Sequence, residues 1–430
     1  MQGLPRDSGY ICLRFLRQGV NYYSSKGGKN VARKLCVGYN EYYKMISMKN
    51  IIRAYKNARK GNTRHDSVAR YDQMLMLNLG TAYRLLYCGK YEVSPYNEFK
   101  VYEPKPRIIK ALPFKDRVIQ HVLFDYIAPK LEKTFIYDSY ANRDGKGTHR
   151  GVYREQQFLR KAGKGSYIIK ADIHHFFDSI DKITLLNILY KKIKDKKIMK
   201  LCEQFIMFDD KPNGIAIGNV TSQLFANVYL NELDHFVKDV LRIKYYVRFM
   251  DDFVINCKTK EEAITILAKV RKFLREFLKL ELNSKTQIFP EKQGVNFLGA
   301  LIKYDYLKIR HKTVKRIKRR INKLSKRVKK LNKKYGENSK QASFISKRIY
   351  VFYVYQSYAS WLGLAKMFYC TSIINKINKK LKELYVTNPK DGKSIMKKIL
   401  SNPYIPNKVI KDSINIAIWN NLLTANTMEK

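Results

Sequence analysis

Paired cysteines, long apolar runs and acidic residues are all scarce in this sequence. The six cysteines are scattered and none forms a C-x-x-C pair, so we expect free thiols of a reducing compartment rather than a disulfide framework or a zinc site. No apolar run approaches the roughly 18 residues of a transmembrane helix, and the N-terminus lacks the apolar core of a signal peptide. We therefore expect a cytoplasmic protein without a membrane partner.

The shortage of acids leaves a large positive charge. The chain has 85 Lys and Arg against 36 Asp and Glu, which gives a formal net charge of +49. Such a surplus opposes compaction and favours a polyanionic partner, with nucleic acid as the first candidate and an anionic membrane surface as the second. Apolar residues make up 45% of the 430 residues, so the chain is globular and long enough for about two or three domains.

Strand and helix patterns mix along the chain without regular βαβ alternation, which predicts an α+β fold. A strand should end at Asp172, in YIIKAD, and KYYVRFMDDFVINCK has the pattern of a strand, a tight turn and a second strand. Residues 221–241 should form a helix with one broad apolar stripe, and VNFLGALIKY a further pair of strands. These elements predict a mixed sheet and helix body before about residue 305.

The composition changes after that point. Residues 311–334 hold 13 Lys or Arg and no acid, and their apolar residues step by 3 and 4, as in a narrow helical seam. A solvated helix in a bundle is one interpretation. We favour a helix that faces phosphates, because nothing within the segment neutralises its charge. The candidates for contacts with a nucleic-acid backbone are Lys315, Arg316, Arg319, Arg320, Lys323 and Arg327.

Two adjacent aspartates, Asp251 and Asp252, interrupt the apolar run YVRFMDDFVI. A buried carboxylate must be protonated, paired or bound to a metal, and the local sequence offers only Arg248 as a cation. Asp172 also ends a strand, and acids on neighbouring strand ends can hold two divalent ions, for which Mg²⁺ suits the hard oxygen ligands. A pair of acids in a surface turn is the simpler interpretation of these residues taken alone.

The order of the surrounding motifs resembles that of reverse transcriptases. ADIHHFFDSID followed by YVRFMDDF resembles motifs A and C, and KPRIIKALPFKDRVIQ, GIAIGNVTSQLFANVYLNELD, LELNSKT and NFLGALI resemble the fingers motif, motif B, motif D and the primer grip. The resemblance covers roughly residues 50–305. It implies a right-hand polymerase fold, with domains divided as follows: fingers, an N-terminal extension and part of the palm in 1–165, the palm in 166–305, and a basic all-α thumb and C-terminal region in 306–430.

The resemblance also implies roles for single residues. Asp172, Asp251 and Asp252 would form the metal-binding triad, and the backbone of Ile173 would help to hold the second of two Mg²⁺ ions, with Mn²⁺ as a substitute. Phe177 would be the steric gate that selects deoxynucleotides. The other expected site residues are the triphosphate-binding Lys105, Arg107 and Arg117, the nucleotide-binding Ile217, Gly218 and Gln223, the proton donor Lys285, and the primer-grip residues Phe297, Leu298 and Gly299.

Motif B indicates the type of reverse transcriptase. IGNVTSQ, residues 217–223, resembles the enzymes of diversity-generating retroelements, with Ile217 where many relatives have Gln. That resemblance implies an RNA-directed DNA polymerase that uses dNTPs and a cDNA or DNA primer to copy a structured template-repeat RNA. Its errors would fall opposite template adenines, and a small basic accessory variability protein would assist it.

Other interpretations stay open. About 125 residues follow the expected primer grip, which also fits an antiphage-defence reverse transcriptase that acts on its own noncoding RNA. A catalytically dead, RNA-binding polymerase relative and a basic protein of membrane surfaces are further alternatives. A mobile-intron maturase is less expected, because no endonuclease motif is recognisable near the C-terminus.

Overall fold

The computed structural model describes residues 36–62, 65–102, 106–335, 356–368 and 370–382. The chain divides into two compact units, Met1–Gln293 and Gly294–Lys430, and we treat each by itself. The expected domain limits at residues 165 and 305 stay predictions. The mixed helix and sheet architecture confirms the predicted α+β class.

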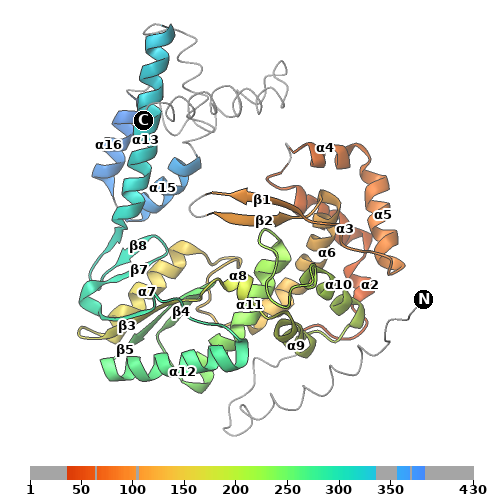
Figure 1. Ribbon diagram of the computed structural model, residues 1–430, viewed down its shortest axis with the longest axis horizontal. Helices are drawn as coiled ribbons and strands as arrows, with labels where there is room; N and C mark the ends of the chain where they lie inside the picture. Colours follow the sequence, from red (N-terminus) through yellow and green to blue (C-terminus); the bar gives the residue numbers. More distant parts are fainter. Residues whose placement is uncertain (1–35, 63–64, 103–105, 336–355, 369, 383–430) are drawn as a thin grey trace. The chain divides into compact units, whose positions relative to one another are not determined.

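A four-stranded sheet forms the framework of the first unit (Figure 1). Its order is β4-β5-β3-β6, with every neighbouring pair antiparallel. The strands are β4 (Tyr246–Phe249), β5 (Asp252–Cys257), β3 (Tyr167–Asp172) and β6 (Gln287–Pro290). The predicted strand end at Asp172 and the predicted strand–turn–strand are therefore confirmed.

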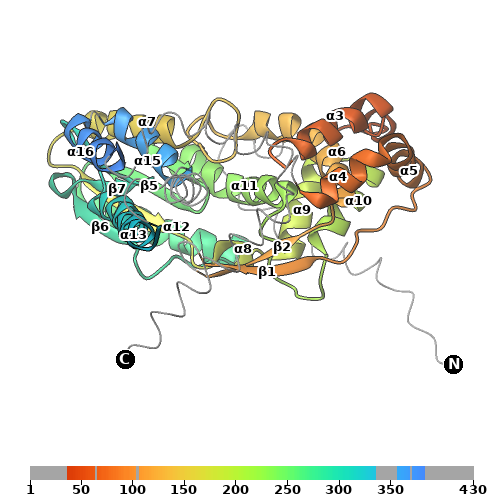
Figure 2. The same ribbon diagram turned by 90° about the horizontal axis from the view of Figure 1, so that it is seen from above.

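Helices cover both faces of this sheet. α7 (Thr148–Ala162) and α12 (Lys260–Leu278) lie on opposite sides of it in both views (Figures 1 and 2). On the α7 side, Asn256 of β5 donates a hydrogen bond to the buried Glu155, at 3.1 Å. Because directly paired residues of an antiparallel sheet point to the same face, Lys170, Asp172 and Asp252 share this face with Asn256.

The helix predicted within residues 221–241 forms, but its burial differs from the expectation. α11 (Val220–His235) is buried around almost its whole circumference and is followed by a π-helical turn, η4 (Phe236–Val240). It packs against α6 (Phe114–Leu131), α9 (Lys182–Lys192) and α12. A helix surrounded by other elements needs no polar face, which is why the single-stripe expectation was wrong.

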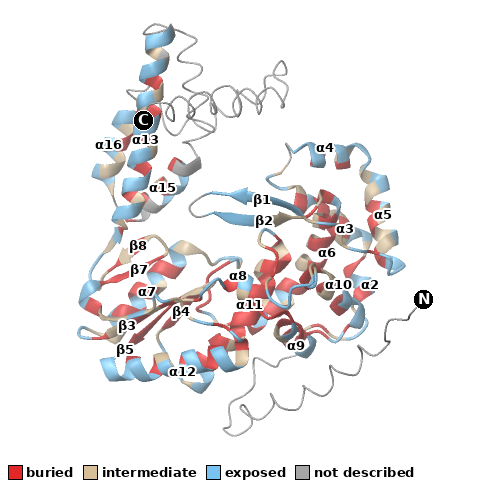
Figure 3. Cartoon of the chain, viewed as in Figure 1, coloured by how far each residue is buried: buried red, intermediate tan, exposed pale blue. Residues whose placement is uncertain are grey.

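The remaining elements of the first unit lie mostly N-terminal to the sheet. The β1–β2 hairpin is largely exposed, whereas α6 and α11 are largely buried (Figure 3). The elements are α2 (Tyr42–Met45), α3 (Met48–Arg59), α4 (Asp66–Gln73), α5 (Leu75–Tyr87), β1 (Asn97–Val101), β2 (Arg107–Ala111), η3 (Glu132–Thr134), α8 (Phe176–Ser179), α10 (Lys196–Ile206) and η5 (Glu291–Gln293).

The second unit combines a small sheet with helices. Strands β7 (Val295–Phe297), β8 (Ala300–Ile302) and β9 (Leu307–Ile309) are antiparallel in that order, as predicted for the strand pair. The long helix α13 (His311–Tyr335) packs against α15 (Gln356–Met367) and α16 (Thr371–Lys382). Its seam is buried at Val314, Ile317, Ile321, Leu324 and Val328. The predicted seam is thus used for packing, and its polar positions remain for other contacts.

Candidate active site

The antiparallel register brings the three predicted aspartates to one end of the sheet. Asp172, the last residue of β3, is directly paired with Asp252, the first residue of β5. β4 and β5 are joined by a two-residue turn of Met250 and Asp251, in which Met250 has φ +55°. The Asp251 carbonyl accepts a hydrogen bond from the Ile173 amide at 3.3 Å. All three aspartates therefore lie at the same end of the β3–β5 strand pair.

The charges at this end are only partly compensated. Burial raises the pKa of Asp251, and the nearby Asp172 carboxylate raises it further, while Arg107 and Lys170 act in the opposite direction. Asp252 forms an ion pair with Lys170 of β3. Asp172 accepts backbone and side-chain hydrogen bonds from Asn283, at 2.7 and 3.4 Å. Asp172 and Asp251 are thus mutually repelling carboxylates in a partly buried place, as expected for ligands of a cation.

These oxygen donors fit a hard divalent ion. Mg²⁺ commonly uses one or two protein carboxylates and completes its coordination with water and substrate phosphates. Among the residues that the structure describes, no three carboxylate, imidazole or thiol groups converge into a complete cation site, and Asp252 is paired with Lys170. Asp172 and Asp251 are the pair that could hold the ion, and the predicted role of the Ile173 backbone stays a prediction.

A fully buried ion pair supports the turn. Arg248 of β4 donates to both carboxylate oxygens of Asp234, at 2.7 and 2.6 Å, and both side chains are 0% exposed. The same guanidinium donates to the Met250 carbonyl at 3.1 Å and to Asn227 at 3.2 Å. Arg248, the one cation of the local sequence, is therefore not a counterion of Asp251 or Asp252. Its guanidinium pairs with Asp234 on α11, and a further N–H of the same group binds the Met250 carbonyl in the turn.

The fingers residues can be placed only in part. Arg107, the first residue of β2, is exposed, and its charge partly opposes the rise in the pKa of Asp251 that burial and Asp172 cause. Arg117 lies on α6, half-buried, with its guanidinium 5.8 Å from the centre of the Phe114 ring, and burial lowers its pKa. Lys105 lies outside the described residues. Arg107 is thus the fingers cation that the structure links to the aspartates.

Motif B is attached to the fingers strand through its backbone. The Ile217 carbonyl accepts a hydrogen bond from the Lys110 amide of β2, at 3.1 Å. Gly218 has φ +116°, and a Cβ there would lie 3.0 Å from a methyl carbon of Ile109 and 3.4 Å from the Lys110 carbonyl. Only glycine suits both this conformation and this approach. Gln223 is half-buried in the first turn of α11.

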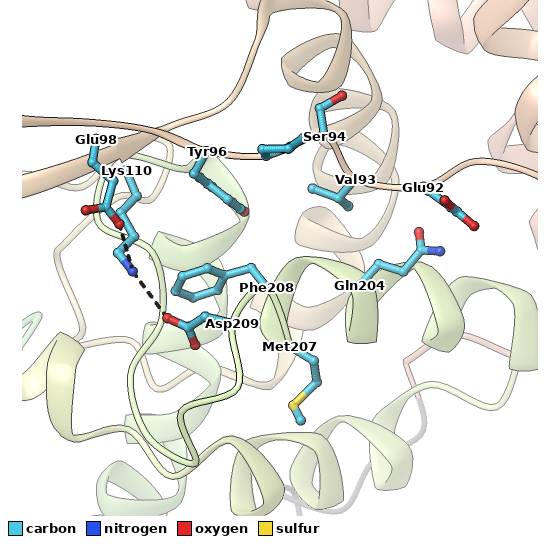
Figure 4. Close-up of a pocket in the computed structure, with 11 residues that line it drawn as sticks. Glu92, Val93, Ser94, Tyr96, Glu98, Lys110, Gln204, Met207, Phe208 and Asp209 are labelled. Atoms are coloured by element: carbon cyan, nitrogen blue, oxygen red, sulfur yellow. Dashed lines mark hydrogen bonds and ion pairs between the residues drawn. The ribbon is translucent and has the colours of Figure 1, made fainter. Parts of the chain in front are cut away.

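The side chain of Lys110, whose backbone binds the Ile217 carbonyl, lines a pocket (Figure 4). The pocket has a volume of about 600 Å³ and is walled by Tyr96 and Phe208, whose ring centres are 5.0 Å apart. Lys110 reaches Glu98 and Asp209, both at 3.2 Å, across it. Lys110 of β2 thus binds the Ile217 carbonyl through its backbone and two acids through its side chain.

Phe177 of motif A and Lys285 of motif D are the remaining expected site residues of the first unit. The Phe177 carbonyl accepts from the Ile215 amide at 3.0 Å, and the half-buried Phe177 ring packs at the edge of the core. Lys285 is exposed, and its amide donates to the Asn283 side chain at 3.1 Å. Because the Asn283 amide in turn donates to the Asp172 carbonyl, motif D is joined to the end of β3. The steric-gate and proton-donor roles stay predictions.

The predicted primer grip and basic helix belong to the second unit. Phe297 is buried in β7, and Leu298 and Gly299 form its tight turn, with φ +49° and +85°. Lys315, Arg316, Arg319 and Lys323 are exposed on α13, whereas Arg320 and Arg327 are half-buried. Their roles in binding nucleic acid stay predictions.

Sequence reasoning missed four residues that surround the aspartates: Lys170, Asn227, Asp234 and Asn283. Lys170 stands two residues before Asp172, so strand alternation could have placed it on the face of the acids. Asp234 and Asn227 lie seven residues apart on one helix face, which is a usable signal. Their partner, however, lies on a strand and could not be identified from the pattern.

Comparison with known proteins agrees with this geometry. The family model for reverse transcriptase (RNA-dependent DNA polymerase) matches residues 100–302. The group II intron-encoded protein LtrA of Lactococcus lactis subsp. cremoris is 25% identical over 302 residues, which cover 53% of this chain and 49% of that protein. Protein YkfC of Escherichia coli (strain K12) is 27% identical over 263 residues, covering 50% of this chain and 68% of that protein.

This chain spans about half the length of LtrA. Among solved structures, telomerase from Candida albicans in complex with a fragment of telomeric RNA has a TM-score of 0.39 and 12% identity, covering 76% of this chain and 66% of that one. A likeness this distant carries no weight for the function. The matched residues 100–302 include β2, all four strands of the four-stranded sheet and each of the three aspartates, and this part of the chain is similar to reverse transcriptases and to group II intron-encoded proteins.

Proposed function

We propose that this chain is an RNA-directed DNA polymerase that adds dNTPs to a cDNA or DNA primer along an RNA template. The observation that carries the proposal is the direct pairing of Asp172 with Asp252 and the place of Asp251 in the adjoining turn, within a reverse transcriptase domain. Mg²⁺ ions held by Asp172 and Asp251 would supply Lewis-acid stabilisation of the reacting phosphoryl oxygens. The net charge of +49 suits the polyanionic template and product.

The chain's own residues would bind and orient the nucleotide. Arg107, whose charge acts on Asp251, would hold the phosphates of the incoming nucleotide, because a guanidinium forms paired bonds to phosphate oxygens. Phe177 would exclude a ribose 2′-hydroxyl. Lys285 would donate a proton to the leaving pyrophosphate. Lys170 would keep Asp252 oriented on the same face.

Primer extension on a defined RNA template tests the activity. We expect Mg²⁺-dependent incorporation by the purified chain, a loss of at least about a hundredfold in Asp251→Asn, and normal activity in Asp144→Asn, an exposed acid outside the site. Incorporation that survives in Asp251→Asn would overturn the assignment of the aspartates. A chain that binds RNA but never incorporates dNTPs would favour the dead-polymerase alternative.

We further propose that the polymerase is error-prone at template adenines, in the manner of diversity-generating retroelements, and copies a structured template-repeat RNA with a small basic accessory protein. The support is Ile217, whose apolar side chain cannot make the hydrogen bonds of the Gln that many relatives carry. Its backbone is held independently by the Lys110 amide, so Ile217→Gln changes the side chain while this bond persists.

Sequencing the cDNA tests this finer proposal. Errors concentrated opposite adenine, reduced severalfold by Ile217→Gln, would support it. Ile217→Val is the matched control, because it keeps an apolar side chain and should keep the error spectrum. Faithful or repetitive cDNA that Ile217→Gln does not alter would overturn the retroelement subtype and favour the antiphage-defence alternative.

A further inference from the structure

One face of α5 is apolar and exposed. Met76, Gly80, Tyr83 and Tyr87 are spaced by 4, 3 and 4 residues and therefore share this face. Met76 is 78% exposed and Tyr87 54%. The rings of Tyr83 and Tyr87 are stacked, with centres 5.6 Å apart and an angle of 28° between their planes. This face of α5 contributes little to the core.

Tyr43 of α2 extends the exposed face. Its ring centre lies 5.8 Å from that of Tyr87, and it is 51% exposed. We call Tyr43, Tyr83 and Tyr87 the tyrosine cluster. Together with Ile46, Ser47 and Met48 they surround a hollow of about 640 Å³.

Tyr42, which precedes Tyr43 in the sequence, differs from it in burial. It is 6% exposed, and its hydroxyl donates to the Leu86 carbonyl at 2.8 Å. Tyr42 is thus a core residue that ties α2 to α5. Tyr43 and Tyr87 are exposed outside this core, whereas Tyr83 is half-buried and packs against its edge. The exposure of the two outer rings is therefore not a requirement of packing.

Cations surround the tyrosine cluster. Lys197 of α10 lies 4.4 Å from the centre of the Tyr43 ring and donates to its hydroxyl at 2.5 Å. Neither α3 nor α5 contains Asp or Glu. The acids beside and within α2 and α10 are engaged: Asp195 accepts from the Tyr42 amide at 2.9 Å, Glu41 pairs with Lys130, and Glu203 accepts from the Tyr190 hydroxyl. Exposed cations on the same elements include Lys44, Lys49, Arg53 and Arg84.

We propose that the tyrosine cluster is a stacking platform for unpaired bases of a single nucleic-acid strand, with the surrounding cations binding its phosphates. Exposed aromatic rings and a positive surface are the two components of sequence-tolerant single-strand binding. Duplex bases are already stacked on one another, so the platform selects unpaired strands. That the natural strand is the RNA being copied rests on the proposed polymerase function. The platform itself requires no catalysis and shares no residue with the candidate active site.

Fluorescence anisotropy with the full chain tests the proposal, in the absence of dNTPs. The probes are a labelled unstructured RNA, a DNA of the same sequence and an RNA duplex. We expect Tyr43→Leu/Tyr87→Leu to weaken RNA binding by roughly tenfold or more, because stacking contributes about 1–3 kcal/mol per base, and to leave duplex binding unchanged. The matched variant Tyr43→Phe/Tyr87→Phe keeps the rings and should bind within about twofold of the original chain.

A direct contact is checked by cross-linking a 4-thiouridine-containing RNA and mapping the modified peptides. Adducts on Tyr43 or Tyr87 that disappear in the Leu variant support the platform. An equal loss on duplex and single strand, or no loss on any probe, overturns it and leaves the cluster as a surface for a protein partner. An equal loss on RNA and DNA supports a platform that ignores the 2′-hydroxyl. Because binding is measured without turnover, a failure of polymerase activity is distinguishable from a failure of the platform.

Discussion

Arg248 and Asp234 form a buried, two-point ion pair directly behind the turn that carries Asp251. The nitrogen–oxygen distances are 2.7 and 2.6 Å, and a third donor of the guanidinium bonds the Met250 carbonyl at 3.1 Å. The Tyr246 hydroxyl also donates to Asp234, at 2.7 Å. One carboxylate on α11 thus fixes both a strand of the sheet and the backbone beside the candidate metal ligands.

Breaking this pair should destabilise the chain strongly. We expect Asp234→Asn to lower the free energy of unfolding by about 3–5 kcal/mol, because the Arg248 charge is left buried without its counterion. Urea denaturation followed by circular dichroism measures it. The control is Glu276→Gln, which breaks an exposed pair with Lys272 and should change stability by less than about 0.5 kcal/mol. Equal effects of the two variants would contradict the structural role of Asp234.

Replacing Asp251 by Asn should have opposite effects on the stability of the chain and on its polymerase activity. Its pKa is raised by burial and by Asp172, so the native chain holds this proton more tightly than the unfolded chain. Stability is then lost as pH rises from the ordinary carboxyl pKa through the raised one. Without divalent ions, Asp251→Asn should therefore be more stable than the original chain at pH 7, and this advantage should vanish at pH 3, although the variant is inactive.

Mg²⁺ should make the original chain more stable than Asp251→Asn. At roughly a hundred times its dissociation constant, an ion that binds only the native state stabilises it by about 2.7 kcal/mol. We expect such a rise in the unfolding free energy of the original chain and a smaller one in Asp251→Asn, while Asp144→Asn follows the original. An equal rise in all three chains would show that Mg²⁺ binds elsewhere.

Glu155 should make the free energy of unfolding depend on pH over a range different from that of Asp251. Burial raises its pKa to about 8, from the ordinary value of 4.5. Between these values the unfolded chain is ionised at this position and the native chain is not, so stability falls by on the order of 1 kcal/mol per pH unit. Glu155→Gln keeps an oxygen for the bond from Asn256 and loses this dependence.

Unfolding measured from pH 5 to pH 9 tests the role of Glu155. The stability of Glu155→Gln relative to the original chain should increase steadily up to about pH 8 and level off above it, where both states of the original chain are ionised. Glu276→Gln, at an exposed position, should show no such trend. A constant difference between the Glu155 variant and the original would show that Glu155 is charged in the native chain.

The polar side of α13 should contribute to affinity for nucleic acid through charge alone. Lys315, Arg316 and Arg319 are exposed, while the apolar seam beside them is buried. We expect replacement of all three by Gln to weaken binding of an RNA–DNA duplex without unfolding the helix. The slope of log affinity against log salt should fall by about 0.9 for each phosphate that the variant no longer neutralises.

A variant with the same loss of charge elsewhere is the control for α13. Lys269, Arg271 and Lys272 are exposed on α12, and replacing them by Gln removes the same three charges. Filter binding at several salt concentrations compares the two triple variants. Equal slopes would show that only the net charge of the chain matters and that α13 makes no phosphate contacts.

The sequence by itself determined the local elements and the candidate site residues. Alternating β-prone runs that stop at Asp172 and at Asp251 predicted the two strand ends, because period-2 patterns and turns are local properties of the chain. The 3-and-4 spacing from Val314 to Val328 predicted the buried seam of α13 for the same reason. The order of the motifs indicated the reverse transcriptase domain.

Only the tertiary structure decided which charges compensate one another. The local sequence offered only Arg248 as a cation near Asp251 and Asp252. In the structure the register of β3 against β5 pairs Asp252 with Lys170, and the packing of α11 against β4 pairs Arg248 with Asp234. Ion pairs form between groups that strand pairing and helix packing bring within a few ångströms, and these distances depend on contacts between residues far apart in the chain. For the same reason the full burial of α11 and the exposed tyrosine cluster emerged only once the neighbours of each helix were known.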